Sequence, residues 1–122
     1  MPQPCTRRTG PTVQEVDSAI TGSIPLGSEV SNVLGFLDSQ TFGSRKFGRD
    51  GYVTDPEIIS ALSKYTTDEK AIELKGTLKG YIAASIPNVS HDLFNTSAII
   101  ATFYFDRNDR LIDYTVKEVL GK

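Results

Sequence analysis

The C-terminal stretch, residues 94–119, constrains the fold more than any other part of the chain. Its two halves, 94–105 and 110–119, are rich in β-branched and aromatic residues, and apolar positions alternate with polar ones. A two-residue period of this kind is typical of strands with one buried face. The residues between the halves, 106–109 (DRND), are of the types that turns prefer. The stretch therefore predicts a β-hairpin.

The turn of this hairpin holds three side chains with oxygen atoms, Asp106, Asn108 and Asp109, which raises the question of a calcium site. A calcium-binding loop needs oxygen ligands at alternating positions and a Glu at the twelfth. Counted from Asp106, the fifth position is Arg110 and the twelfth is Lys117. Because cations at ligand positions repel a metal ion, the pattern predicts a plain turn, with no metal and no cofactor.

The hairpin also assigns side chains to faces, because directly opposed residues on paired strands share one face of the sheet. A four-residue loop and a two-residue loop give the same assignment. The face of Phe103 is then mostly apolar: Ile99, Ala101, Phe103, Phe105, Ile112, Tyr114 and Val116. The other face is mixed: Ala98, Thr102, Tyr104, Leu111, Asp113, Thr115 and Lys117. Such a division predicts that helices cover one face of an antiparallel sheet.

Two helix signals lie in the first third of the chain. Thr12 and Glu15 have the spacing of a capping box, and apolar residues follow at helical spacing as far as Gly22, which can end the helix. A second helix is predicted from Ser28, as the N-cap, to about Gln40. The apolar stripe of this second helix is Val30, Val33, Leu34 and Leu37.

The middle of the chain is less regular. Residues 41–54 contain three glycines and suggest a loop or a ragged edge strand. Asp55 before Pro56 predicts the start of a third helix. Between residue 75 and residue 86 the apolar period changes to two, which predicts a further strand, and residues 87–92 are expected to form a connection.

These elements predict an α+β fold, with two or three helices packed on one face of a three- to four-stranded antiparallel sheet that ends in a C-terminal β-hairpin. We expect residues 1–10 to be a flexible arm and residues 11–122 to form a single domain. A cystatin-like or nuclear-transport-factor-like curved sheet around a helix is the alternative. Gly35, inside the second helix, is interpreted as a point of close packing. The expected core is Val30, Val33, Leu34, Leu37, Ile82, Ile99, Ala101, Phe103, Ile112 and Val116.

Charge and composition narrow the classes of function. Thirteen Lys and Arg against fifteen Asp and Glu give a net charge of −2, which argues against a nucleic-acid partner. No stretch approaches the roughly 18 apolar residues of a membrane span, and no apolar segment follows Met1. The protein is therefore expected to be cytoplasmic, or to be periplasmic or secreted with its export signal trimmed. Cys5, the single cysteine, is either a free thiol or the lipidated first residue of a lipoprotein.

No catalytic residue is predicted. Ser90, His91 and Asp92 have the residue types of a hydrolytic triad, but the members of a triad come from separate segments of a chain. His91, the single histidine, is expected in a solvated loop. Most acidic residues fall at predicted helix starts and turns, where capping explains them. The patterns lean toward a protein that is not an enzyme.

Two blocks of the chain, SIPLGSEVSNVLGFLDSQ and FYFDRNDRLIDYTVKEV, resemble small bacterial envelope domains. The pattern is similar to that of the small outer-membrane assembly lipoproteins and of the repeats of β-lactamase inhibitor protein, in which helical segments pack on an antiparallel sheet. The chain departs from the pattern at Asp109, where the hairpin turn usually has a glycine, and at residues 54–76, which add a helix. The resemblance covers about half of the chain and implies a non-enzymatic envelope or inhibitor-like module.

Two functions follow as alternatives. The first is a small non-enzymatic binding module, of the bacterial cell envelope or secreted, that acts through a protein partner. The second is a small ligand-binding domain or enzyme with a pocket between helices and sheet, and a deep pocket lined by Tyr81, Tyr114 and an acid would favour it. The binding surface predicted for the module lies on the mixed face of the hairpin, where aromatic and arginine side chains are common interface anchors. Its residues are Tyr104, Leu111, Arg107 and Arg110.

Overall fold

The computed structural model describes residues 7–59, 77–91 and 96–121. Two helices, α1 (Val13–Ser23) and α2 (Val30–Ser39), follow a short first strand, β1 (Arg7–Arg8). Three two-residue strands come next: β2 (Thr41–Phe42), β3 (Arg45–Lys46) and β4 (Gly48–Arg49). The three long strands are β5 (Gly80–His91), β6 (Thr96–Phe105) and β7 (Leu111–Gly121).

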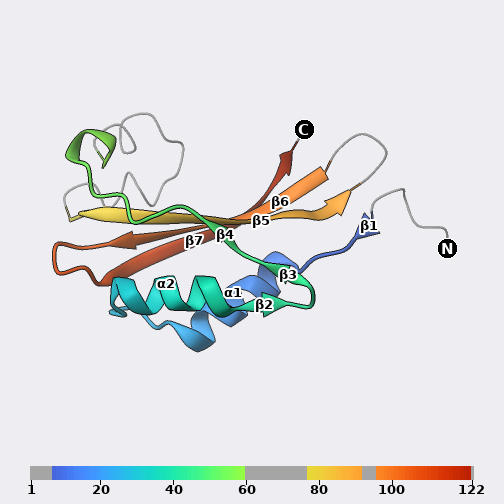
Figure 1. The fold of residues 1–122 in the computed structure, drawn as a ribbon, viewed down its shortest axis with the longest axis horizontal. Helices are drawn as coiled ribbons and strands as arrows, with labels where there is room; N and C mark the ends of the chain where they lie inside the picture. Colours follow the sequence, from blue (N-terminus) through green and yellow to red (C-terminus); the bar gives the residue numbers. More distant parts are fainter. Residues whose placement is uncertain (1–6, 60–76, 92–95, 122) are drawn as a thin grey trace.

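The main sheet is antiparallel and has the strand order β1-β5-β6-β7, with β4 also paired to β5. Helices α1 and α2 lie along one face of this sheet, and the helical turn at residues 56–59 lies on the opposite side (Figure 1). Strands β2 and β3 form a separate two-stranded sheet. The predicted α+β class is confirmed, with two helices packed on one face of an antiparallel sheet and a C-terminal hairpin, while the third predicted helix begins on the opposite side.

The helix starts follow local capping chemistry. At α1 the Thr12 hydroxyl accepts the backbone N–H of Glu15 at 3.1 Å, and the Glu15 carboxylate accepts that of Thr12 at 3.3 Å, so the predicted capping box is confirmed. At residue 55 the carboxylate accepts the Glu57 N–H at 2.9 Å, as expected for the third helix. The remainder of that predicted helix lies outside the described residues.

The predicted N-cap of α2 is wrong by one residue. The cap is Glu29, which makes no side-chain capping bond, whereas the Ser28 hydroxyl donates to the Pro25 carbonyl at 2.6 Å. The backbone around Ser28 is instead used for a tertiary contact. The Leu111 N–H donates to the Ser28 carbonyl and the Gly27 N–H donates to the Leu111 carbonyl, both at 2.8 Å. The segment before α2 is thereby attached to the start of β7.

Two predictions about the end of β5 are wrong, namely that residues 87–92 form a connection and that His91 lies in a loop. Strand β5 does not end before Pro87 but continues to His91, through an irregularity between Ile86 and Ser90 where Asn88 has a φ of 56°. A bulge accommodates a proline within a strand. His91 therefore belongs to a strand and not to a loop.

The prediction of a flexible arm is wrong for residues 7–10, while residues 1–6 lie outside the described part of the chain. Arg7 and Arg8 pair with the end of β5. The N–H groups of Thr9 and Gly10 both donate to the Val89 carbonyl, at 2.9 and 3.0 Å. Arg7 and Arg8 thus form an edge strand, which the proline- and glycine-rich composition of this part of the chain did not indicate.

A second bulge, in the C-terminal hairpin, changes the face of two residues. Tyr104 pairs with Asp113 but Phe105 pairs with Leu111, so Ile112 is the extra residue of β7. One inserted residue reverses the alternation of side chains. Leu111 therefore joins the core under the helices, and Ile112 packs on the face of the sheet away from α1 and α2, which we call the reverse face. The predicted faces of these two residues are therefore reversed.

The main core lies between α1, α2 and the sheet. Six of the expected core residues are buried there: Val33, Leu37, Ile82, Ile99, Ala101 and Phe103. Val30, Leu34 and Val116 pack partly buried at its margin. A smaller cluster on the reverse face joins Ile59 and Leu78 to Tyr104. The interpretation of Gly35 is wrong, because a Cβ at this position would meet nothing within 4 Å.

Candidate functional site

Candidate sites lie at the surface, because buried side chains of the main core occupy the layer between the helices and the sheet. Three open grooves in the described residues have volumes of about 490, 430 and 440 Å³. They lie on the reverse face of the sheet, between α1 and β7, and between α2 and the hairpin turn. Their chemistry differs, and each groove is considered in turn.

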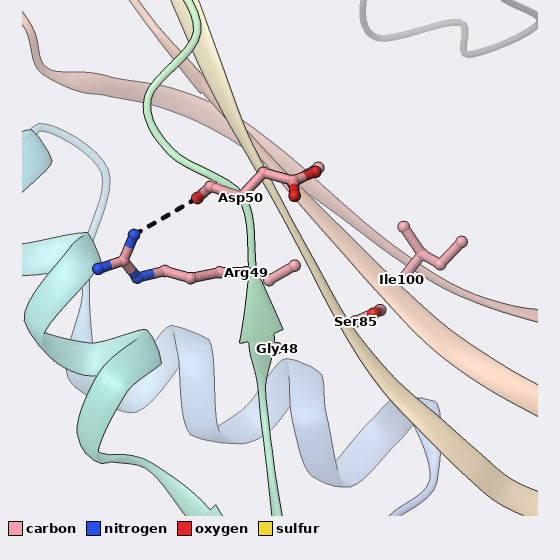
Figure 2. Close-up of a pocket in the computed structure, with 7 residues that line it drawn as sticks. Gly48, Arg49, Asp50, Ser85 and Ile100 are labelled. Carbon is pink, nitrogen blue, oxygen red and sulfur yellow. Dashed lines mark hydrogen bonds between the residues drawn. The ribbon is translucent and has the colours of Figure 1, made fainter.

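The groove on the reverse face is bounded by β4, β5 and β6 (Figure 2). Figure 2 shows the Arg49 side chain extending toward α2. The Arg49 guanidinium binds both carboxylate oxygens of Asp38, at 2.7 and 2.9 Å. This hydrogen-bonded pair holds the pKa of the Asp38 carboxyl below its usual value. The polar side chains left at the groove are Asp50 and Ser85, beside the small Ala83.

Tyr52 and Asp109, which line the groove at the hairpin turn, form with Lys79 a cluster of three connected polar side chains, which we name the Asp109 cluster. The Asp109 carboxylate accepts hydrogen bonds from the Tyr52 hydroxyl at 2.9 Å and from the Lys79 ammonium at 2.7 Å. The Lys79 hydrogen bond, followed by that of Tyr52, lowers the pKa of Asp109. Burial, and then the bond to Asp109, raises the pKa of Tyr52. The cluster joins the loop before residue 53, the start of β5 and the hairpin turn.

The geometry of the turn confirms that residues 106–109 reverse the chain. The Asp106 carboxylate accepts the backbone N–H groups of Asn108 and Arg110, at 2.8 and 3.1 Å. Asp109 has a φ of 60°, in the left-handed region that Asn and Asp tolerate better than most residues. The carboxylates at 106 and 109 thus accept hydrogen bonds from donors of the protein itself.

We expect the Asp109 cluster to make stability depend on acidic pH. Because the folded-state pKa of Asp109 is lowered, its contribution is present above the usual carboxyl value of 3.8 and is lost as the pH falls through the folded-state value. Asp109→Asn tolerates the same backbone conformation but has no charge. Urea unfolding should give wild type a higher free energy of unfolding than Asp109→Asn at neutral pH. The difference should shrink below about pH 3.8.

The control for this measurement is Asp50→Asn, which removes an exposed carboxylate outside the cluster. At neutral pH its free energy of unfolding should stay close to that of wild type. A difference between wild type and Asp109→Asn that is equally large at acidic and neutral pH would show that the charge of Asp109 is not responsible.

The groove between α1 and β7, the α1–β7 groove, has an apolar part and an acidic part. Val13 of α1 and Val116 of β7 supply the apolar part. Asp17 and Asp113 contribute carboxylates. The Tyr114 hydroxyl lies between the two elements, 2.6 Å from Asp17 Oδ1, to which it donates, and 2.8 Å from the Thr21 hydroxyl. Burial raises the pKa of Tyr114. Gln14 completes the lining.

The two edges of the sheet differ in how they are covered. The outer edge of β5 is bonded along its length to β1, Thr9–Gly10, β4, Asp50 and Val53. The outer edge of β7 is covered at Leu111 by residues 27 and 28. From residue 112 to residue 121, no strand of the described chain pairs with β7 on the side away from β6. The α1–β7 groove runs beside this edge.

The predicted binding surface on the hairpin is not assembled. Tyr104 is 0% exposed and Leu111 is 1% exposed, and they lie in different clusters on opposite faces. Ile59 and Leu78 cover Tyr104, and the bulge turns Leu111 into the main core. The prediction is therefore wrong for these two residues.

The two arginines of that prediction lie at the hairpin turn. Arg107 is exposed. The Arg110 guanidinium donates to the Gly27 carbonyl at 3.1 Å and lies 3.5 Å from the Glu29 carboxylate. Arg110 therefore helps to attach the turn to the segment before α2. The open edge of β7 was not predicted, because it depends on which other segments pair with that strand.

The suspected triad residues have other surroundings. Ser90 is buried, and its hydroxyl contacts the Ser97 hydroxyl and lies 3.3 Å from Glu118 Oε2. Ser97 donates to the same oxygen at 2.8 Å. Asp92 lies outside the described residues. Ser90 thus belongs to a hydrogen-bonded group across three strands.

No protein-family model, curated protein or solved structure matches the chain. Within the described residues, no helix combines the length and the apolar content that crossing a bilayer requires. The same residues contain no group of three or more His, Cys, Asp or Glu side chains placed to hold a metal ion.

Proposed function

We propose that this protein is a non-enzymatic binding module that takes an extended segment of a protein partner as an added strand along β7. The observation that carries the proposal is the edge at residues 112–121, which has no pairing strand in the described chain. An exposed sheet edge binds an extended peptide through main-chain hydrogen bonds, while alternate side chains of the peptide enter neighbouring pockets. The α1–β7 groove is placed to receive such side chains.

The composition of β7 supports this use of its edge. Proteins protect long edge strands from unwanted pairing with prolines, inward-pointing charges or lysines. Strand β7 spans eleven residues and contains no proline. Its protecting features are the bulge at Ile112, Lys117, and Glu118, which lies opposite Ile99 on the side of the main core. Near its end, Leu120 is 76% exposed. By contrast, backbone bonds cover the outer edge of β5, so among the long strands of the described residues β7 has the edge that remains for a partner.

The alternative, a ligand pocket between helices and sheet, has less support. Buried apolar side chains occupy that layer, and Tyr114 meets its acid, Asp17, in an open groove. Tyr81 packs instead against the cluster on the reverse face. A location in the cell envelope or outside the cell belongs to the proposal through the sequence resemblance alone.

A selection of displayed ten-residue peptides tests the proposal. Selected peptides should protect backbone amides of residues 112–120 from hydrogen exchange. Gln14→Trp, on the exposed surface of α1, should fill the α1–β7 groove and abolish binding. Ser18→Trp is the matched control, because Ser18 is exposed on the same helix but does not line the groove.

Thermal unfolding of both tryptophan variants should match wild type, since neither replaced side chain is buried. Peptides that bind Gln14→Trp as well as wild type, or that protect amides of β4 and β5 in place of β7, would overturn the proposal.

A further inference from the structure

The electrostatic character of the α1–β7 groove indicates which kind of strand would bind there, and this inference rests on the proposed function. The charged side chains within the bounds of α1 and β7 are mostly acidic: Glu15, Asp17, Asp113 and Glu118, against the single Lys117. Complementary charge selects partners and speeds their association. An added strand with basic residues therefore fits this edge better than an acidic one.

The two carboxylates that line the groove lie on different sides of the sheet. Asp113 pairs with Tyr104 and shares the reverse face with it. Tyr114 faces α1, where its hydroxyl bonds to Asp17. A strand paired with β7 has a residue opposite each of these positions, and opposed residues share a face. One of its residues therefore lies beside Asp113, and the next lies beside Tyr114 and Asp17.

Both carboxylates already have partners within the protein. Asp17 Oδ1 accepts the Tyr114 hydroxyl, and Asp113 Oδ1 accepts the Tyr114 N–H at 2.8 Å. An ionised carboxylate has about four acceptor positions on its two oxygens. A Lys or Arg side chain of the added strand can therefore share these carboxylates with their present partners.

The apolar part of the groove sets a third requirement. Val116 faces α1 on the same side as Tyr114, two residues further along β7. The residue of the added strand opposite Val116 therefore points toward Val13 and Val116. We infer that the partner segment contains two consecutive basic residues, one variable residue and one apolar residue. A parallel strand has them in this order, and an antiparallel strand has them in the reverse order.

Synthetic ten-residue peptides test this inference. One carries Lys-Lys-Thr-Val at its centre, one carries Val-Thr-Lys-Lys, and matched peptides replace both Lys by Glu or by Gln. Titrations followed by backbone amide shifts measure the dissociation constant and the location of binding together. One Lys-Lys peptide should bind to β7 at least about fivefold more tightly than its Glu-Glu counterpart at low salt, and added salt should reduce the difference.

Protein variants assign the contacts. Asp17→Asn and Asp113→Asn should each weaken binding of the Lys-Lys peptide by about two- to fivefold. Asp50→Asn, which removes an exposed carboxylate at the groove on the reverse face, should leave this binding unchanged. Asp17→Asn keeps an oxygen that can accept the Tyr114 hydroxyl. Asp113→Lys should prefer a peptide with Glu in place of the Lys that lies beside residue 113, which tests the register.

The outcomes separate this inference from the proposed function. Equal binding of the Lys, Gln and Glu peptides at β7, or unchanged binding to Asp17→Asn and Asp113→Asn, would overturn the charge requirement and leave strand addition in place. The charge requirement would also be overturned, and strand addition would stand, if displayed peptides without basic pairs protect β7 while both Lys-Lys peptides fail to bind. If neither kind of peptide affects β7, both conclusions are wrong.

Discussion

Phe103→Ala should lower the free energy of unfolding by about 3–5 kcal/mol, the usual cost of removing a buried phenylalanine ring. Phe103 is 0% exposed and lies on the central strand β6. It is flanked on the same face by Ile82 and Tyr114, and its ring stacks with that of Tyr114 at a centroid distance of 6.0 Å. A cavity here would lie in the middle of the main core, where the chain cannot easily close it.

Urea unfolding at neutral pH measures this cost. Phe42→Ala is the matched control, because Phe42 lies half-buried at the margin of the same core. Phe42→Ala should lower the free energy of unfolding by clearly less than Phe103→Ala does. If Phe103→Ala destabilises the protein no more than Phe42→Ala does, the main core is not centred on β6.

The second large effect is expected at Gly80, the first residue of β5. A Cβ added there would lie 2.5 Å from the Val53 carbonyl oxygen and 2.6 Å from a ring carbon of Tyr52. Val53 is held in place by backbone bonds to Tyr81 in both directions, at 2.9 and 3.0 Å. Since a backbone atom cannot move as a flexible side chain can, Gly80→Ala should cost about 1–3 kcal/mol or more.

Gly35→Ala is the matched control with the opposite expected sign. Gly35 lies inside α2, where an added methyl group meets open space, so alanine should stabilise the helix by about 1 kcal/mol. Urea midpoints of the two variants should therefore lie on opposite sides of wild type. A Gly80→Ala protein as stable as wild type would show that the segment around Val53 does not pack closely on β5.

Much of the local structure could be predicted because it depends on neighbours in sequence. The capping box of α1 needs only Thr12 and Glu15, three residues apart, and the turn at 106–109 needs only side chains that bond to nearby backbone. The apolar alternation of β6 placed Ile99, Ala101 and Phe103 on the buried face, as observed. Each of these predictions rests on contacts within a few residues.

The failed predictions concern places where distant segments meet. Strand β1 forms because Arg7 and Arg8 pair with His91 and Ser90 of β5, more than eighty residues later in the chain. The proposed binding edge was missed for the same reason, since whether a strand lies at an edge depends on what the other segments cover. The predicted surface at Tyr104 and Leu111 assumed an unbroken alternation and an open reverse face, and the structure has neither.

By itself, the sequence determined the α+β class, the starts of α1 and of the third helix, the hairpin turn and most of the core. These features follow from hydrogen bonds and apolar periods that operate over one or two turns of chain. Only the tertiary structure decided the positions of the two bulges, the pairing of residues 7–10, the burial of Tyr104 and the exposure of the β7 edge. Such features depend on which backbone groups find partners across the sheet, and no local pattern of residues encodes that choice.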